Sequence, residues 1–234
     1  MPTKHLWRLL GLIIILIISG CSSVIDSKNE GNHSSSSSEG PTITIIASGR
    51  ELVKNSDRLL SESYRKGMTT RDLLKTNGIV RLTEEGTGIL SISGISLGPD
   101  MEWELQLDGN SIKDLSVDTS VNHDSKIVIT AKSTDGEEAL QSVILTVNGG
   151  NRQVELTHSY VILFTEDLTV RSLLKSFDKV QLSEDNKNIV SANDYKPFSN
   201  EVWKLKVNGK QLLENGMDMK LRPQDEVEIV LTLR

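Results

Sequence analysis

The side chains best suited by type and spacing to covalent chemistry are serines that stand three positions before a lysine. This spacing occurs at three places: Ser63 with Lys66, Ser172 with Lys175, and Ser176 with Lys179. It can place a lysine beside a serine nucleophile, but the enzymes that use it also carry Ser-Asp-Asn and Lys-Thr-Gly segments, which this sequence lacks. A Gly-x-Ser-x-Gly spacing occurs at residues 94–98, but a nucleophile elbow leads from a strand into a helix, and the segment that follows here is the tryptophan strand. No phosphate loop or dinucleotide fingerprint occurs either. We therefore predict that these serines lie on solvated helix faces and that the protein is not an enzyme.

Candidate metal ligands are few and scattered. The four histidines stand far apart in the sequence, at positions 5, 33, 123 and 158. Two pairs of adjacent carboxylates, Glu84–Glu85 and Glu184–Asp185, would suit calcium binding or general-acid catalysis. The spacing Asp-x-Asp-x-Asp-Gly of a calcium loop is missing, however. We expect a polar turn at both pairs and no metal site.

The single cysteine, Cys21, ends an N-terminal segment with the features of an export signal. Lys4 and Arg8 are followed by an apolar run over residues 9–18, about ten residues long, whereas a membrane span needs roughly 20. The run ends in a branched apolar residue, two small residues and the cysteine: Ile18, Ser19, Gly20 and Cys21. This tetrapeptide resembles the lipobox of bacterial lipoproteins.

The lipobox resemblance implies that residues 1–20 are a signal peptide, removed after a diacylglycerol is attached to the Cys21 thiol. Two or three acyl chains would then anchor the protein stably to a membrane. We expect it on the extracytoplasmic face, at the cell membrane of a single-membrane host or the outer membrane of a two-membrane host. Residues 21–40 are rich in serine and offer little to bury, so they read as a disordered tether after the lipidated cysteine.

The overall charge excludes one class of partner. The formal net charge of the 234-residue chain is -6, and no long run of lysine and arginine occurs. Nucleic-acid binding needs a basic patch for the phosphates, so we expect no nucleic-acid partner.

The remainder of the chain is an internal repeat with an offset of 100 residues. Between 69–109 and 169–209, 13 of 41 positions are identical, including Trp103 with Trp203. Near the C-terminal end the best match is 126–130 with 228–232, so the offset between the repeats slips by two residues there. The sequence thus predicts a first repeat over residues 41–131, a linker over 132–141 and a second repeat over 142–234.

Each repeat predicts an α+β domain with a single short helix. The helix begins after Thr69 or Thr169, which are good N-caps, and carries paired leucines at helical spacing. The tryptophan segments, 103–107 and 203–207, alternate as strands and end in Asp-Gly or Asn-Gly, a hairpin signal. In the first repeat, the stretch 52–68 is weakly patterned and reads as loop-rich. We expect two tandem β-grasp-like domains, each a small mixed sheet with one short helix.

The repeats resemble a family of bacterial secreted domains that are similar to the C-terminal β-domain of transcobalamin. The resemblance rests on short motifs spread over both repeats: Thr69-Thr70 with Leu73-Leu74, Ile89 to Gly94, Trp103 to Gly109, and Asp225-Glu226-Val227. The second repeat departs from the pattern at Val190 to Asp194 and at Gln224, where glycine is usual. The resemblance implies a corrinoid as a ligand. It also implies a partner protein, because such a module forms only half of a corrinoid site.

Four residues at equivalent positions are the candidates for contacting a ligand or partner. Trp103 and Trp203 lie on the same strand face as their aliphatic neighbours, so a place in the core is the alternative to ligand stacking. Arg71 and Arg171 lie opposite the leucine pair, where a solvated helix face is the alternative to an anion-binding surface. We predict a non-catalytic, membrane-anchored binding or interaction module with an envelope protein as partner; the alternative is corrinoid binding together with a partner or transporter.

Overall fold

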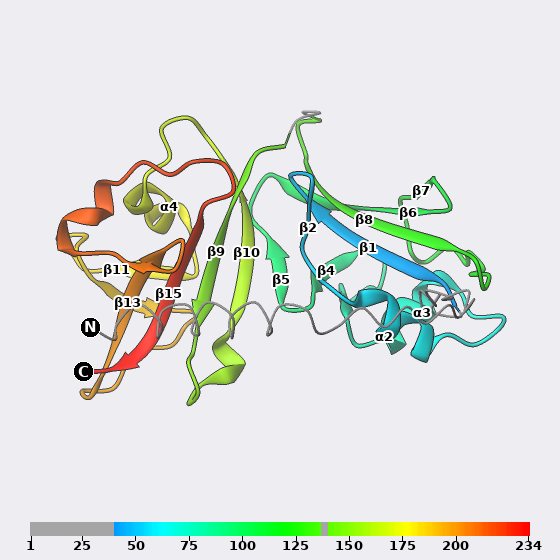
Figure 1. The fold of residues 1–234 in the computed structure, drawn as a ribbon, viewed down its shortest axis with the longest axis horizontal. Coiled ribbons are helices and arrows are strands. Elements are labelled where there is room, and N and C mark those ends of the chain that lie inside the picture. Colours follow the sequence, from blue (N-terminus) through cyan, green and yellow to red (C-terminus); the bar gives the residue numbers. More distant parts are fainter. Residues whose placement is uncertain (1–39, 137–139) are drawn as a thin grey trace, which may run out of the picture. The chain divides into compact units, whose positions relative to one another are not determined.

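The computed structural model describes residues 40–136 and 140–234, and these form an α+β fold with few helices (Figure 1). The lipobox residues and Cys21, together with the rest of residues 1–39, lie outside the described part of the chain. No described helix is both long and apolar enough to cross a membrane.

The first repeat supplies a five-stranded sheet and a second group of short strands. Among the described residues, the sheet has the order β2-β1-β8-β6-β7. Its strands are β1 (Thr42–Ala47), β2 (Arg50–Glu51), β6 (Met101–Leu107), β7 (Asn110–Ile112) and β8 (Lys126–Ser133). The other strands of this repeat are β3 (Val80–Leu82), β4 (Ile89–Ile92) and β5 (Ile95–Leu97).

The second repeat continues into those short strands of the first. In the described part of the chain, one sheet has the order β14-β13-β15-β9-β10-β5-β4-β3, so its last three strands come from the first repeat. The second repeat provides β9 (Ser142–Asn148), β10 (His158–Leu163), β13 (Glu201–Val207), β14 (Lys210–Gln211) and β15 (Glu226–Leu233). A separate hairpin joins β11 (Val180–Leu182) to β12 (Ile189–Ala192).

The first and last strands of each repeat are parallel neighbours, and their register corrects the sequence alignment. β6 pairs with β8 as β13 pairs with β15, with Leu105 opposite Ile129 and Leu205 opposite Ile229, so the offset of 100 holds to the end. The expected slip of two in the last strand is therefore wrong. The two-residue shift lies in the first strand instead. There Ile43 lies opposite Ile127, whereas Leu145 lies opposite the equivalent residue, Val227. A shift of two keeps every side chain on its own face, so the buried pattern conceals it.

The expected helices are present, and the first repeat contains an additional one. α3 (Thr70–Thr76) and α4 (Val170–Ser176) begin after Thr69 and Thr169, whose side chains accept hydrogen bonds from the backbone of residues 72 and 172. This confirms the predicted N-caps. The expectation of a single helix in the first repeat is wrong, because α2 (Ser56–Ser63) occupies the stretch that read as loop-rich.

α2 forms because tertiary contacts hold a short segment of ordinary helix formers. Leu60 is completely buried in the core of the first repeat. The start of the helix is tied to β1: Ser56 Oγ donates to the Ile43 carbonyl (2.8 Å), and the Ile43 N–H donates to Asp57 Oδ1 (2.6 Å). No side-chain N-cap marks the start in the sequence, since Asn55 makes no capping bond. A helix of eight residues depends on such packing, because short helices are marginal by themselves.

Each repeat has its own aliphatic core, and both tryptophans pack against it. Leu73 and Leu74 are buried with the strands of the first repeat, as Leu173 and Leu174 are in the second. Trp203 is buried in the second core, and Trp103 is partly buried against the first, as the strand alternation predicts.

A third, smaller cluster joins the two repeats. β5 pairs in parallel with β10, through Ser159 with Ile95 and Val161 with Leu97. Val161 is buried there with Ala47, Met101 and Ala131 of the first repeat. The repeats therefore share both backbone hydrogen bonds and a hydrophobic contact.

Candidate functional site

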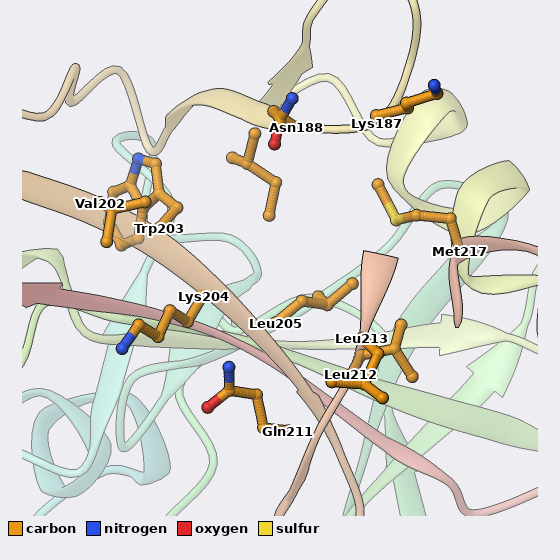
Figure 2. A pocket seen from close by; sticks show the side chains of 11 residues that line it. Lys187, Asn188, Val202, Trp203, Lys204, Leu205, Gln211, Leu212, Leu213 and Met217 are labelled. Atoms are coloured by element: carbon orange, nitrogen blue, oxygen red, sulfur yellow. The ribbon is translucent and has the colours of Figure 1, made fainter. Parts of the chain in front are cut away.

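A groove beside strand β13 in the second repeat combines an exposed apolar side chain with two lysines. Its volume is about 320 Å³. We call it the Trp203 groove; it is lined by Lys187, Asn188, Ile189, Val202, Trp203, Lys204, Leu205, Gln211, Leu212, Leu213 and Met217. Figure 2 shows Trp203 and Met217 on opposite sides of the hollow, with Leu205, Leu212 and Leu213 along another side.

The β13–β14 hairpin positions most of the groove. Successive side chains of a strand point to opposite faces, so Trp203 and Val207 enter the core while Lys204 and Lys206 face outward. The turn uses Asn208 and Gly209, both with positive φ (49° and 76°), which suits a type I′ hairpin. Asn208 also holds the turn to β15, because its Oδ1 accepts the Glu226 N–H (2.9 Å).

The apolar wall of the groove is unusually open to solvent at one residue. Leu213, just after β14, is 79% exposed, whereas Met217 in the 3₁₀ helix η2 (Glu214–Asp218) is buried. A leucine this exposed at the rim of a hollow indicates a contact surface, since exposed apolar patches mark interaction sites.

Two lysines at the groove lack a close ion pair among the described residues. Neither Lys187 nor Lys204 forms an ion pair with any residue that the structure describes. Lys206, the next outward lysine of β13, differs because its Nζ lies 2.9 Å from Glu228 Oε2. Burial works to raise the pKa of the Glu228 carboxyl, but hydrogen bonds from Lys206 and Asn148 outweigh it and hold this pKa below its ordinary value.

The backbone of β13 has a free edge beside the groove. The Asn208 N–H donates to the Glu226 carbonyl (2.8 Å), so even-numbered residues of β13 bond to β15 and odd-numbered ones face away. β14 pairs only with Lys206 and Val207, and the Leu212 N–H adds a bond to the Leu205 carbonyl (2.8 Å). Among the described residues, no backbone group bonds to Trp203 on this outer side.

The equivalent place in the first repeat carries different side chains. β7 pairs with β6 through Ile112 opposite Leu105, one pair further than β14 reaches along β13. The chain then turns inward, where Leu115 is buried and its N–H donates to the Thr87 carbonyl (3.0 Å). Glu104 replaces Lys204 and is ion-paired with Lys132.

The two tryptophans share one unsatisfied group. Both indole Nε1 atoms are buried without a hydrogen-bond partner in the described structure. A buried donor without a partner costs stability. Because both repeats have this feature, it does not by itself mark the groove.

The two predicted arginines are used to support loops. Arg171 holds Asp218 with two bonds, Nε to Oδ1 (2.7 Å) and Nη2 to Oδ2 (3.1 Å), and also donates to the Asn186 carbonyl. The hydrogen bond that Arg171 donates to the Asp218 carboxylate raises the pKa of Arg171. Within the described part of the chain, Arg71 makes one side-chain hydrogen bond, to the Glu85 carbonyl at 3.4 Å. The structure does not bring either arginine to the Trp203 groove.

The serines with Ser-x-x-Lys spacing bond to their own helices. Ser63, Ser172 and Ser176 donate to the carbonyls of residues 59, 169 and 173, respectively. Both pairs of adjacent carboxylates lie on exposed turns, as expected. Among the described residues, no group of three or more His, Cys, Asp and Glu side chains is placed to hold a metal ion.

The junction between repeats contains a histidine that the sequence did not single out. His158 Nε2 lies 2.9 Å from Ser96 Oγ of the first repeat. Burial, and to a lesser degree the charge of Arg81, lower the pKa of His158.

Sequence reasoning did not identify the groove residues Leu213, Lys204 and Lys187. The repeat alignment held a usable signal, because Lys113 and Glu104 stand where the second repeat has Leu213 and Lys204. An exchange of a charged residue for an apolar one at a strand end indicates that the two copies have different surfaces.

Comparisons with known proteins include a distant structural likeness. No protein-family model matches the chain, and no curated protein matches it. A crystal structure from Ruminococcus gnavus ATCC 29149, named a "putative metal binding protein", is 17% identical; the match covers 40% of this chain and 98% of that one, with a TM-score of 0.32.

Proposed function

We propose that the protein is a lipid-anchored, extracytoplasmic binding module without catalytic activity, and that its second repeat binds through the Trp203 groove. The observation that carries the proposal is the groove itself, which the 79% exposed Leu213 lines together with Lys204, a lysine without an ion-pair partner among the described residues. Its volume of about 320 Å³ is at the lower end of the range for ligand sites, roughly 300–1,000 Å³.

We also infer that the two repeats are tandem β-grasp-like domains. Two features support this: the first and last strands of each repeat are parallel neighbours, and a short threonine-capped helix packs on the same core. The additional helix α2 and the sheet shared between the repeats depart from the expected pair of separate domains with one helix each.

The experiment for the binding site uses the full chain displayed on bacterial cells. A photo-crosslinking amino acid replaces Leu213, and a matched variant carries it at Val154, which is also strongly exposed (64%) but lies in the 3₁₀ helix Val154–Leu156. We expect one adduct of defined mass from position 213, identified as an envelope protein and lost when Lys204→Glu is added. Equal labelling from both positions would contradict the proposal.

The anchor is tested at Cys21. Wild-type protein should incorporate radiolabelled palmitate and remain with the membrane fraction, and Cys21→Ala should lose both properties. Unchanged processing and membrane retention in Cys21→Ala would overturn the lipoprotein assignment.

Corrinoid binding with a partner protein is the second candidate, supported by the sequence resemblance and by the tryptophan in the groove wall. Trp203 is only 6% exposed, so a flat ring would meet mainly Leu213 and Leu205. Titration with cobalamin should then quench tryptophan fluorescence, and Leu213→Asp should abolish the quenching. Folded protein with no quenching at high micromolar cobalamin would exclude this candidate for the chain acting alone.

A further inference from the structure

We propose that the Trp203 groove takes an extended peptide, alternating acidic and apolar residues, which adds as a strand to the free edge of β13. The inference rests on the proposed function, because it uses the same groove and specifies the chemistry of the partner. The partner is therefore a protein segment in β conformation.

The backbone of β13 is the first reason. The N–H and C=O groups of Trp203 point away from β15, and no described backbone group bonds to them. Edge groups of this kind are templates for another strand, and peptide recognition by strand addition uses them for affinity. The β14 hairpin ends at Gln211 and does not cover Trp203. At Glu201 the N–H already donates to the Phe198 carbonyl (3.0 Å) and the carbonyl accepts from Arg234 Nε (3.2 Å), so the open edge is Trp203 itself.

The apolar side chains are the second reason. Side chains of an added strand alternate between the two faces, so every second one would point into the groove. There they would contact Leu205, Leu213 and Met217. The 79% exposure of Leu213 would fall when such a side chain packs against it.

Charge complementarity selects acidic residues for the intervening positions. The remaining side chains of the strand would lie on the outer face of the sheet, beside Lys204. Lys187 lies at another part of the rim, where the Ser183 hydroxyl and, to a lesser degree, the Lys187 charge lower the pKa of Asp185. Lys204 forms no ion pair with a described residue. The whole chain has a net charge of -6, so Lys204, which has no ion-pair partner among the described residues, is a local exception to its overall sign.

The first repeat does not offer this combination. Glu104 takes the place of Lys204 and would repel an acidic strand, and Leu115 is folded inward. The first repeat therefore serves as an internal control for the second.

The direct test uses a synthetic seven-residue peptide with glutamate at odd positions and valine at even positions, capped at both ends. It is titrated into the full chain in detergent, and binding is measured by calorimetry. We expect micromolar affinity, weakened at least about tenfold by Lys204→Glu and by Leu213→Asp. Lys113→Glu and Val154→Asp, which change surfaces outside the groove, should leave it unchanged.

Two altered peptides separate strand addition from general attraction. Lysine in place of glutamate should abolish binding, and N-methylation of alternate amides should weaken it at least about tenfold because it removes ladder donors. Hydrogen exchange should show new protection of the Trp203 amide in the complex. Equal binding of the N-methylated or the lysine peptide would overturn the inference.

The outcome also distinguishes the inference from the function on which it rests. If the acidic peptide does not bind while the crosslink at position 213 persists, the groove binds something else and the strand-addition inference is wrong. If both the peptide and the crosslink fail, the proposed function is wrong as well.

Discussion

The two repeats end their sheets differently, although their sequences align without a gap through this region. In the first, β5 pairs with β10, and the Gly98 N–H donates to the Val161 carbonyl (2.7 Å). In the second, the equivalent residues 195–197 form no strand, and Phe198 stands where Gly98 does. The Phe198 N–H donates instead to Glu201 Oε2 of its own repeat (3.1 Å).

The side of each repeat that contains β10 or its equivalent stretch shows a second difference. In the second repeat, β10 receives the neighbouring β5; in the first, the equivalent stretch 58–63 belongs to helix α2 and cannot accept a strand. Each repeat therefore has one side that pairs and one that does not. Two copies of one fold can therefore form a closed pair. The unpaired side of the first repeat is blocked by helix α2, and that of the second by Phe198, whose N–H is satisfied locally.

The largest effect should come from removing core volume in either repeat. Leu73→Ala and Leu173→Ala each delete a completely buried side chain and should lower the free energy of unfolding by about 2–5 kcal/mol. Because the repeats share strands and a hydrophobic cluster, urea unfolding followed by circular dichroism and by fluorescence should remain one transition. Leu59→Ala, at a partly exposed site, is the control with a small effect. Separate transitions in the unmutated protein would refute the coupling.

The junction itself should break when the first repeat receives the residue of the second. Gly98→Phe would place a Cβ 3.3 Å from both the Val161 carbonyl oxygen and Ile162 Cγ1, so β5 must move away from β10. We expect a loss of about 1–3 kcal/mol and a splitting of the urea transition in two. Phe198→Ser removes the exposed counterpart and should cost at most about 1 kcal/mol. A single unshifted transition in Gly98→Phe would mean that the strand pair does not couple the repeats.

A smaller difference is expected at the paired arginines. Arg171→Met removes two bonds to Asp218 and one to the Asn186 carbonyl, whereas Arg71→Met removes one long bond. The melting temperature should fall further for Arg171→Met, and the difference should shrink in high salt because the ion pair is screened. Equal melting temperatures at low salt would show that the arginines are equivalent.

The smallest effect should be a pH dependence at the junction. The lowered pKa of His158 means that the folded protein binds this proton more weakly than the unfolded chain. The free energy of unfolding should therefore fall as pH decreases through about 6.5, the ordinary histidine value, and be fully present above it. His158→Gln should flatten this part of the pH profile, whereas His123→Gln, at a more exposed site, should not. An unchanged profile in His158→Gln would assign the dependence to other groups.

Much of the local structure was predictable because it depends on neighbours in sequence. Threonine caps, leucine pairs and Asn-Gly or Asp-Gly turns act within a few residues, and all three occurred where expected. The alignment placed the two-residue shift in the last strand although it lies in the first. The error arose because a shift of two preserves the alternation of buried and exposed residues on which the alignment depended. The groove was missed because its walls come from three segments, 187–189, 202–205 and 211–217, that only folding brings together.

The sequence by itself determined the repeat and the class of secondary structure around each tryptophan, and it carries the lipobox resemblance on which the proposed anchor rests. Only the tertiary structure decided which sheet edges pair and which stay free. That decision depends on contacts between residues far apart in the chain: Gly98 allows the backbone of β10 to approach, whereas Phe198 and Glu201 satisfy their own edge. Among the described residues no such contact covers the backbone of Trp203 at the edge of β13, and there we expect the protein to bind its partner.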